Sequence, residues 1–563
     1  MCLAPGTGIS CKAMGNHARP PEPASETPQA EGYSQERLVT ALRDGRCYPH
    51  AVKNVRLAET HTSWVFLAGR YAYKIKKALD LGFLNFTSLE SRRFYCEEEI
   101  RLNRRLAPQI YRDVIPIGGK PEAPELDAQP AIEYAVRMRR FPVSNELDKL
   151  AAHGKLMPRH IDSLAATIAN FHDNLVPVEP GSAFGSVAVV HSAAFQVFNK
   201  LQTLLANSED AARIGRLRQA AENEFADRKA HFGRRHAQGF IRECHGDLHL
   251  GNIVLIRGQP VAFDCMEFDP GLRWIDVMNE IAFTVMDLLH WKLPRLAYRF
   301  LNAYLEITGD YQGVGVLRFY IASRATVRAM VNAIRANQPG LPDNDKVKAL
   351  ANCRSFLALA AECLAQHRPA LIITHGLPGS GKTTFAQAAL ERLQAIRIRS
   401  DVERKRLFGI PPLADSRSHP VSIYGSDTTQ RTYARLHELA RELLAAGVPV
   451  IVDAAFLKRD ERDSFHQLAR ELGAPFVIAS LQSSPATLRA RIIQRQAASD
   501  DASEADLGVL EKLEKDQQVL SPQERKCAVE FINDTNSIAD DVHAWSRLSR
   551  LVSRMPERQP GCN

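Results

Sequence analysis

Residues 376–383 read Gly376-Leu377-Pro378-Gly379-Ser380-Gly381-Lys382-Thr383 and fit the pattern G-x-x-x-x-G-K-[ST] at every fixed position. An apolar run, residues 370–374, comes just before them, and a run of helix-forming residues, 385–390, follows. This strand, loop and helix setting indicates a phosphate-binding loop, because its glycines allow backbone N–H groups to turn toward phosphate oxygens at a helix N-terminus. Lys382 would reach the β- and γ-phosphates and Thr383 would bind Mg²⁺, with Thr384 in the same binding segment. The stretch therefore predicts a site for a nucleoside triphosphate.

The sequence around this loop alternates apolar strands with helices from about residue 368 to residue 554. Strands are expected at 370–374, 396–398, 449–453, 476–481 and 529–532, and helices fit between them, for example at 432–446 and 485–496. Such alternation predicts a parallel sheet covered by helices on both faces. The third of these strands ends in Asp453, which after a phosphate-binding loop is predicted to bind Mg²⁺ or its water shell.

A second constellation of polar residues lies in the middle of the chain. Residues 244–253 read Cys-His-Gly-Asp-Leu-His-Leu-Gly-Asn-Ile, and an apolar strand farther on ends in Asp264. Phosphoryl transfer to a hydroxyl needs a carboxylate that accepts the hydroxyl proton, and oxygen ligands for Mg²⁺. Asp247 suits the first role, and Asn252 and Asp264 suit the second. The offset from Asp247 to Asn252 (252 − 247 = 5) equals that of the protein-kinase catalytic loop H-R-D-x-x-x-x-N.

The elements expected around this constellation divide into two groups. Strands are predicted at 63–67, 71–76 and 132–138, with a helix at 89–105 and an apolar helical face over 161–171. Strands followed by helices predict a small β-rich lobe and a larger helical lobe. His172, at the end of that helical face, is interpreted as a packed or capping residue.

The middle region resembles the aminoglycoside-phosphotransferase-like family, whose motif reads H-G-D-x-H-x-x-N followed by a strand that ends in Asp. The resemblance covers about residues 38–360 and implies a protein-kinase-like fold with a strand lysine on the α- and β-phosphates, held by a helix glutamate. Lys74 and Lys76 lie on one face of a strand, and Lys74 is preferred, with Lys76 then a surface charge. Glu97, Glu98 and Glu99 compete as its partner, and Glu99 is preferred. Residues 138–141 are where a hinge would hold adenine.

Two features of the middle region depart from the protein-kinase pattern. No G-x-G-x-x-G precedes Lys74, and Cys265-Met266 follows Asp264 where kinases have Phe-Gly. Two further carboxylates, Glu267 and Asp269, could join the metal or substrate site. Asp276 is interpreted as a helix cap that braces the catalytic loop.

The phosphate-loop region resembles the gluconate-kinase and polynucleotide-kinase-like P-loop phosphotransferases. The resemblance implies that Asp401 faces the acceptor hydroxyl as a base and that Arg404 helps to place the acceptor, although Asp401 could also be the N-cap of a helix. Arg491 and Arg495 share a helix face. In the resembled family such arginines lead into a lid, here residues 497–506, and neutralise the transferring phosphoryl group; a solvated basic face is the alternative. Residues 533–536 end the last strand, where adenine packs in that family.

The composition fits a multidomain globular protein. The chain has 563 residues, of which 45% are hydrophobic and 24% charged, and a net charge of +8. The predicted organisation is a disordered leader at 1–32, a phosphotransferase-like domain at 33–366, a P-loop domain at 367–555 and a disordered tail at 556–563; Met14 could be the true start. The fold class is α/β and α+β. Ten dispersed cysteines without metal-ligand spacing, and no apolar run that could cross a membrane, indicate a cytoplasmic protein.

The two regions together match a bacterial type of fused protein. We expect an ATP- and Mg²⁺-dependent phosphotransferase with two active sites that act on hydroxyls of small-molecule acceptors. One alternative is a regulatory or ligand-binding protein with one inactive domain, and another is a nucleic-acid 5′-end kinase. Dispersed basic residues without interleaved aromatic platforms count against nucleic acid. The sequence names neither acceptor and gives no oligomeric state.

Overall fold

The computed structural model describes residues 28–80, 85–206, 208–365, 368–412, 414, 423, 425–498, 505–534 and 538–553. Its chain forms two compact units, which are treated separately below. The first comprises Met1–Trp291 and Phe319–Ala361, and the second comprises Lys292–Arg318 and Glu362–Asn563. The predicted domain boundary near residue 366 lies close to the division at Ala361, whereas Lys292–Arg318, assigned from sequence to the first domain, packs in the second unit.

Both predicted terminal segments fall largely outside the described residues. Helix α1 (Pro28–Ala41) begins four residues before the predicted end of the leader at residue 32, because the helical run starts at its proline, which suits a first helical position. The predicted tail at 556–563 and most of the predicted lid at 497–506 lie outside the described ranges.

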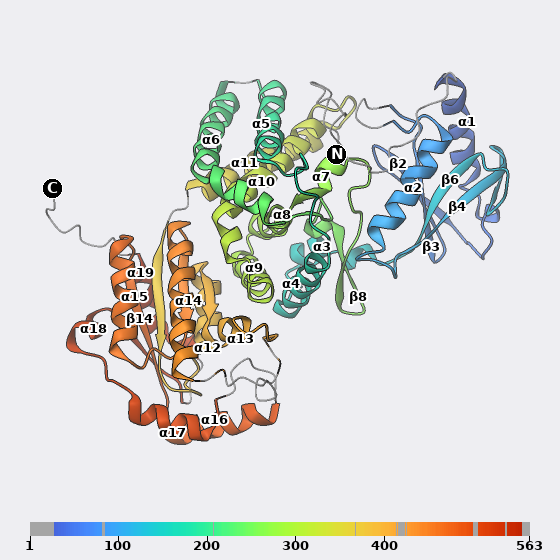
Figure 1. The fold of residues 1–563 in the computed structure, drawn as a ribbon. Helices are drawn as coiled ribbons and strands as arrows, with labels where there is room; N and C mark the ends of the chain where they lie inside the picture. The colour runs from blue at the N-terminus through green and yellow to red at the C-terminus, as the bar shows by residue number, and fades with distance from the viewer. Residues whose placement is uncertain are drawn as a thin grey trace. The chain divides into compact units, whose positions relative to one another are not determined.

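The N-terminal lobe of the first unit is an antiparallel sheet that carries helix α2 (Leu89–Asn103) (Figure 1). The strand order is β1-β2-β3-β6-β4-β5. The strands are β1 (Val55–Glu59), β2 (Ser63–Ala68), β3 (Tyr71–Lys76), β4 (Tyr111–Lys120), β5 (Ala123–Leu126) and β6 (Glu133–Arg139). The predicted β2–β3 hairpin is confirmed, with Gly69 at a φ of 56° in its turn. Helix α2 starts where Ser88 caps it by accepting a hydrogen bond from the backbone N–H of Ser91.

The C-terminal lobe of the first unit is helical, as predicted. Its helices are α3 (Leu147–Ala152), α4 (Pro158–Asp173), α5 (Val187–Leu204), α6 (Ser208–Ala237), α7 (Pro270–Arg273), α8 (Val277–His290), most of α10 (Val314–Ala336) and most of α11 (Asp343–Ala365). Two short antiparallel pairs, β7 (Ile241–Glu243) with β10 (Trp274–Asp276) and β8 (Ile253–Ile256) with β9 (Gln259–Ala262), carry the candidate catalytic segments. Nearly every residue of α8 is buried, so its polar side chains face other protein groups.

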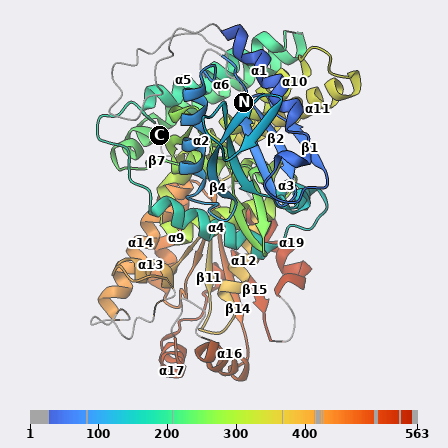
Figure 2. The ribbon, with the colours of Figure 1, turned by 90° about the vertical axis from the view of Figure 1, so that its right-hand side faces the viewer.

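The second unit is a parallel five-stranded sheet with strand order β12-β13-β11-β14-β15. The strands are β11 (Ala370–His375), β12 (Ile396–Arg399), β13 (Pro449–Asp453), β14 (Phe476–Gln482) and β15 (Ala528–Ile532), each within two residues of its predicted bounds. Figure 2 shows β11, β14 and β15 side by side. The helices are α9 (Pro294–Thr308), α12 (Lys382–Leu393), α13 (Ser400–Arg406), α14 (Ser426–Ala445), α15 (Arg459–Glu471), α16 (Pro485–Ala498), α17 (Leu507–Asp516), α18 (Pro522–Lys526) and α19 (Val542–Val552).

Helix α9 belongs to the second unit through a set of buried polar contacts. Asn302 donates a hydrogen bond to the carbonyl of Ala395 (2.9 Å) and accepts one from the backbone N–H of Arg397 (2.7 Å). Glu306 pairs with the guanidinium groups of Arg397 and Arg399, each at 2.8 Å. These contacts give backbone and side-chain groups at the edge strand β12 polar partners, and they hold a helix far from the phosphate loop in sequence against its sheet.

The helices in the described ranges include none long and apolar enough to span a membrane. The cysteines of the same ranges are free thiols.

Candidate active sites

The first site is centred on two lysines of strand β3 that share one glutamate of α2. Lys74 Nζ lies 2.9 Å from Glu99 Oε1 and 3.0 Å from Asp264 Oδ1. Lys76 Nζ lies 2.8 Å from Glu99 Oε2 and 2.6 Å from Glu267 Oε1. Burial alone would raise the pKa of Glu99, but the two ammonium groups outweigh it and the pKa is lowered. The fold thus brings charged side chains of β3, of α2 and of the segment after β9 into direct contact.

This geometry bears on the alternatives that the sequence left open. Both Lys74 and Lys76 contact Glu99, so the preferred pair is present. The interpretation of Lys76 as a surface charge is wrong, because its side chain is 0% exposed. Alternation along β3 did put both lysines on one face, but whether that face met solvent or α2 depends on tertiary packing. Glu97 pairs instead with Arg93, and Glu98 with Arg101 and Arg273.

The segment that carries Asp247 forms a compact loop before β8. Asn252 Nδ2 donates hydrogen bonds to Asp247 Oδ2 (3.1 Å) and to the Asp247 carbonyl (3.0 Å), which fixes the carboxylate against the loop. Because the amide nitrogen is engaged, the side-chain oxygen of Asn252 is the atom suited to a cation. His249 Nε2 lies 3.6 Å from Asp247 Oδ2. The predicted base and one predicted metal ligand are therefore neighbours.

Asp264 reaches the same loop through the residue before it. The backbone of Phe263 makes two hydrogen bonds to this loop. Its carbonyl accepts one from the His245 ring (2.9 Å), and the Phe263 N–H donates the other to the carbonyl of Asn252 (2.9 Å). Asp264 itself has a φ of 61°, and its N–H donates to the Tyr111 hydroxyl (3.1 Å). The nearby Lys74 ammonium lowers the pKa of the Asp264 carboxyl, which therefore stays ionised and suits a cation.

One face of helix α8 holds the loop that carries Asp247, and these contacts were not predicted from the sequence. Glu280 accepts hydrogen bonds from the backbone N–H groups of His245 (2.6 Å) and Gly246 (2.8 Å). One turn on, Thr284 donates to the carbonyl of Leu248 (2.8 Å), and after a further turn Asp287 accepts from Leu250 N–H (2.9 Å). Polar residues at i, i+4 and i+7 in an otherwise apolar helix are the signal that could have revealed this face.

Glycine at position 246 is required by the same arrangement. Gly246 has a φ of 88°, and a Cβ atom there would lie 2.8 Å from the Leu272 carbonyl oxygen. Burial alone would raise the pKa of Glu280, but the neighbouring His172 ring, whose Nε2 lies 3.7 Å from Oε1, together with the His245 ring and the hydrogen bond from Gly246 N–H, lowers it to about 2. Glu280 is thus an anion that accepts hydrogen bonds from two backbone N–H groups. His172 is buried at the end of α4, as predicted for a packed histidine.

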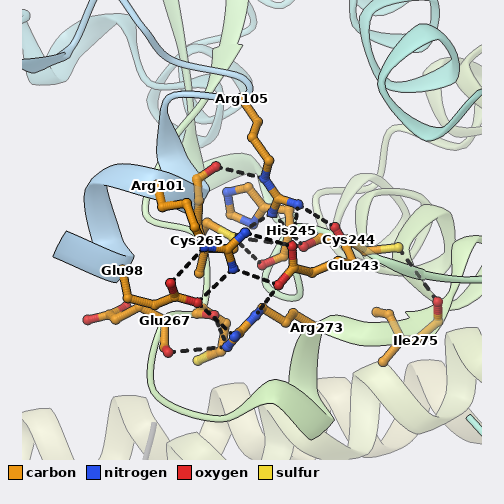
Figure 3. A network of polar contacts seen from close by, with 12 residues as sticks. Glu98, Arg101, Arg105, Glu243, Cys244, His245, Cys265, Glu267, Arg273 and Ile275 are labelled. Carbon is orange, nitrogen blue, oxygen red and sulfur yellow. Dashed lines mark hydrogen bonds and ion pairs between the residues drawn. The ribbon is translucent and has the colours of Figure 1, made fainter. Parts of the chain in front are cut away.

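A second polar network ties α2 to the strand before the catalytic loop (Figure 3). Glu243 pairs with Arg101 (2.7 Å), Arg273 (3.1 Å) and Arg105 (3.2 Å), while Arg105 also donates to the Cys244 carbonyl (3.1 Å). Burial opposes ionisation of Glu243, yet these guanidinium groups lower its pKa to about 2. The network fixes α2, and with it Glu99, relative to the loop.

Two carboxylates near this network have structural roles. Asp276 caps α8 by accepting from Met278 N–H (2.9 Å), as predicted, and is held by both Nε (2.7 Å) and Nη2 (2.8 Å) of Arg235. Asp269 caps α7 by accepting from Gly271 N–H (2.7 Å). Glu267 pairs with Lys76, so only this member of the predicted Glu267 and Asp269 pair adjoins the lysine cluster.

The second site is the predicted phosphate loop between β11 and α12. Gly376, Gly379 and Gly381 have φ values of 146°, 84° and 93°, a region that favours glycine. A Cβ on Gly381 would lie 2.2 Å from Asn533 Nδ2, so the loop is also packed too closely for a side chain. Lys382 begins α12, and its Nζ donates to the Leu377 carbonyl (2.9 Å) across the loop. Residues 376–384 thus lie in the strand, loop and helix arrangement that their pattern predicts.

Asp453 lies at the end of β13, next to the loop in the sheet. It is 5% exposed, and its Oδ2 has no hydrogen-bond partner within the part of the chain that the structure describes. The nearest cation is Arg399, whose Nε lies 3.9 Å from that oxygen. Burial raises the pKa of Asp453. A buried carboxylate with one oxygen that accepts no hydrogen bond from the described residues fits a divalent cation, for which Thr383 in the first turn of α12 could supply a hydroxyl.

Two polar residues of α13 were predicted to handle the acceptor. Asp401 lies in the first turn of the helix, but the N-cap position belongs to Arg399, so the N-cap reading of Asp401 is wrong. Arg404 is buried, and its Nη1 donates to the Ile423 carbonyl and to Thr429 Oγ1, each at 3.3 Å. Arg404 therefore contacts the protein itself, while Asp401 is partly exposed and accessible to an acceptor.

The predicted lid arginines lie on α16. Arg491 donates to the carbonyls of Gly379 (3.2 Å) and Asn533 (2.8 Å), so its guanidinium holds the phosphate loop to the segment after β15. Asn533 in turn donates to the Ser380 carbonyl (3.0 Å). The side chain of Arg495 lies outside the described residues. A cavity of about 320 Å³ adjoins the loop, between Gly376, Ser380 and Arg525.

Comparisons with known proteins bear on both units. Residues 93–320 match the model of the phosphotransferase enzyme family, and residues 371–520 match the model of an AAA domain. The chain thus carries a phosphotransferase domain of the protein-kinase-like fold followed by a P-loop kinase-like domain, as predicted from the sequence. Together the two domains indicate ATP-dependent phosphotransfer.

Individual proteins are similar to part or most of this chain. An uncharacterized protein of Mycobacterium tuberculosis (strain ATCC 25618 / H37Rv) is 29% identical over 479 residues, which cover 83% of this chain and 92% of that protein. Among solved structures, a gluconokinase from Sinorhizobium meliloti 1021 is 23% identical with a TM-score of 0.25, covering 33% of this chain and 95% of that one. An aminoglycoside phosphotransferase from Alicyclobacillus acidocaldarius is 14% identical with a TM-score of 0.34, covering 61% and 96%.

Proposed function

We propose that the chain is a bifunctional phosphotransferase that moves the γ-phosphoryl group of ATP to a hydroxyl of a small molecule at each of two sites. The observation that carries the proposal is the ion-pair set of the first unit. Lys74 contacts both Glu99 and Asp264, while Asn252 holds Asp247. A kinase needs these four functions, namely a phosphate-binding cation, its anchor, oxygen ligands for a metal and a carboxylate for the hydroxyl proton.

At the first site the residues divide the work as follows. Lys74 binds phosphate oxygens of ATP, and Glu99 keeps its ammonium in place. Asn252 and Asp264 would hold Mg²⁺, whose chemical contribution when bound is to neutralise phosphate charge. Asp247 orients the acceptor hydroxyl and takes its proton as the acceptor oxygen bonds to the γ-phosphorus. The bond from that phosphorus to the β–γ bridging oxygen breaks, and ADP leaves.

At the second site the phosphate loop supplies the cradle. Backbone N–H groups of residues 376–384 and the Lys382 ammonium bind the phosphates of ATP, and Thr383 and Asp453 would hold Mg²⁺. Asp401 is the proposed acceptor of the hydroxyl proton. Arg491 and Arg495 are proposed to neutralise the transferring group, and the Gly379 and Asn533 carbonyls keep the first of them beside the loop. The free thiols of the chain fit our placement of the protein in the cytoplasm.

The test is ADP release across a panel of hydroxylated metabolites. We expect Asp247→Asn to lower the turnover of one set of acceptors at least 100-fold. Lys382→Ala should lower the turnover of a different set by a similar factor. Lys155→Ala and Lys458→Ala, at exposed lysines of the two units, serve as matched controls. If neither Asp247→Asn nor Lys382→Ala alters any turnover, the proposal is lost. Transfer confined to oligonucleotide 5′-ends, or tight ATP binding with no acceptor-dependent ADP, would support the alternatives.

A further inference from the structure

Two arginines one turn apart on α10 lie outside the machinery described above. Arg324 donates from Nε to Asn279 Oδ1 (2.8 Å), and its guanidinium carbon lies 4.8 Å from the centre of the Phe283 ring. Arg328 lies over the Phe356 ring at 5.9 Å. Within the described part of the chain, Arg324 Nη2 and Arg328 Nε are buried without a hydrogen-bond partner, and neither arginine forms an ion pair.

Arg324 differs in this respect from the other buried arginines of the first unit. Arg92, Arg235 and Arg273 are each under 9% exposed, and each pairs with a carboxylate at 2.9, 2.7 and 2.9 Å, respectively. Arg324 is 8% exposed and has no such partner among the residues that the structure covers. A buried cation without a directly bound counter-charge costs free energy. A guanidinium cannot avoid this cost by losing its proton, because its pKa is too high. An anion bound from outside the protein would supply a direct partner.

The place of Arg324 connects it with the catalytic carboxylate. The Phe283 ring beneath its guanidinium meets the His249 ring edge-on, with the ring centres 5.5 Å apart. His249 Nε2 in turn lies 3.6 Å from Asp247 Oδ2. Burial lowers the pKa of Arg324, with Glu280 and Asp247 opposing that effect through their charge. The rings of Phe283 and His249 thus lie between Arg324 and Asp247, the carboxylate that would take the acceptor's proton.

From these observations we infer that Arg324, assisted by Arg328, binds an anionic group of the acceptor and that the first unit phosphorylates a hydroxyl of an acidic small molecule. The planar fork of an arginine matches the oxygens of a carboxylate or a phosphate, and either group would supply the missing charge. This inference rests on the proposed function of the first site, because it concerns the acceptor of that reaction. It separates this site from kinase sites for neutral or cationic alcohols.

The first experiment measures anion binding without turnover. Inorganic phosphate is titrated at constant ionic strength into the full chain carrying Lys382→Ala, which weakens the other phosphate site, and hydrogen exchange of peptides from α8 and α10 is followed. We expect phosphate to slow exchange in these peptides and Arg324→Gln to abolish the effect. Arg328→Gln, at a half-buried position, should weaken binding at least threefold even if Arg324→Gln does not fold. Arg335→Gln, exposed on the same helix, should change nothing. Unaltered protection in Arg328→Gln and Arg324→Gln, or none in the parent, overturns the inference.

The second experiment identifies the anion. The Lys382→Ala chain is offered acceptors that share a skeleton, namely glycerol, glycerate and glycerol 3-phosphate, and glucose, gluconate and glucose 6-phosphate. We expect Asp247-dependent turnover of acidic members only, and at least a tenfold rise in KM in Arg328→Gln with a smaller change in kcat. The acid that is preferred distinguishes carboxylate from phosphate. Equal turnover of neutral members overturns the inference and leaves the proposed function standing. If no acceptor is turned over, the proposed function loses support, and the phosphate titration still decides the subsite.

Discussion

The two lysines proposed to bind phosphates, Lys74 and Lys382, are held in opposite ways. Lys74 contacts carboxylates 25 and 190 residues away, on α2 and after β9. Lys382 donates to a carbonyl five residues earlier in its own loop. The first site is therefore assembled from side chains that only the tertiary fold brings together, and the second is built on the backbone of one contiguous stretch.

The difference extends to the balance of charge. In the first site the ammonium groups of Lys74 and Lys76 contact three carboxylates, so the cluster has a formal charge of −1 (2 − 3) without any ligand and both lysines are fully paired. In the second site Asp453 is buried with its nearest cation at 3.9 Å. The first unit should consequently lose stability when one of these lysines is removed, whereas the second unit should gain stability when the charge of Asp453 is removed.

The largest expected effect is that of Lys76→Met. The substitution leaves Glu267 without its ammonium partner and Glu99 with only one, in surroundings where the Lys76 side chain is 0% exposed. We expect the first unit to lose about 3–5 kcal/mol of unfolding free energy, as is usual when one member of a buried ion pair is removed. Urea unfolding followed by hydrogen exchange of β3 and α2 peptides measures it.

The matched change in the other unit is Lys382→Met. Its ammonium donates to a backbone carbonyl, so we expect a loss below about 1 kcal/mol in the second unit, together with loss of its ATP binding. If the two substitutions destabilised their units equally, the contrast between a tertiary and a local site would be wrong.

A smaller effect should come from the groups that position the two loops. Glu280→Gln keeps the size of the side chain but removes the charge that accepts from two backbone N–H groups of the catalytic loop. We expect a loss of about 2 kcal/mol in the first unit and a fall in kcat of at least tenfold with little change in KM. The comparable change in the second unit is Arg491→Gln, which affects two carbonyls and should cost about 1 kcal/mol.

The pH dependence of stability gives an independent check on Glu280. Its pKa is lowered to about 2 in the folded chain, so the unfolded chain binds the proton more tightly. The stabilisation is thus fully present above the ordinary glutamate range and is lost as the pH falls toward 2. The stability difference between wild type and Glu280→Gln should shrink over that interval. A difference that stays constant down to pH 3 would show that the charge does not matter.

The same contrast explains how much the sequence could predict. The loop at 376–384 and the strands around it were predicted almost to the residue, because their pattern is local and glycine marks the backbone positions. Asp247 and Asn252 were found for the same reason. The burial of Lys76, the contacts of Glu280 and the packing of α9 on β12 could not be derived from spacing, since each depends on which distant element covers a face. Strand alternation predicted on which face of β3 Lys76 lies, but that face is buried only because α2 packs against it.

A small effect of opposite sign, and the sharpest test of the second site, is expected for Asp453→Asn. Burial raises the pKa of Asp453, so the folded chain binds its proton more tightly than the unfolded chain. The charged form therefore costs stability above the folded-state pKa, and the cost disappears as the pH falls below the unfolded value. We expect Asp453→Asn to stabilise the second unit by on the order of 1 kcal/mol at neutral pH without Mg²⁺, and the gain to vanish in acid. Added Mg²⁺ with ATP should stabilise wild type but not the variant. A variant less stable than wild type at neutral pH would mean that Asp453 is already satisfied by protein groups, and the assignment of a cation to this position would fail.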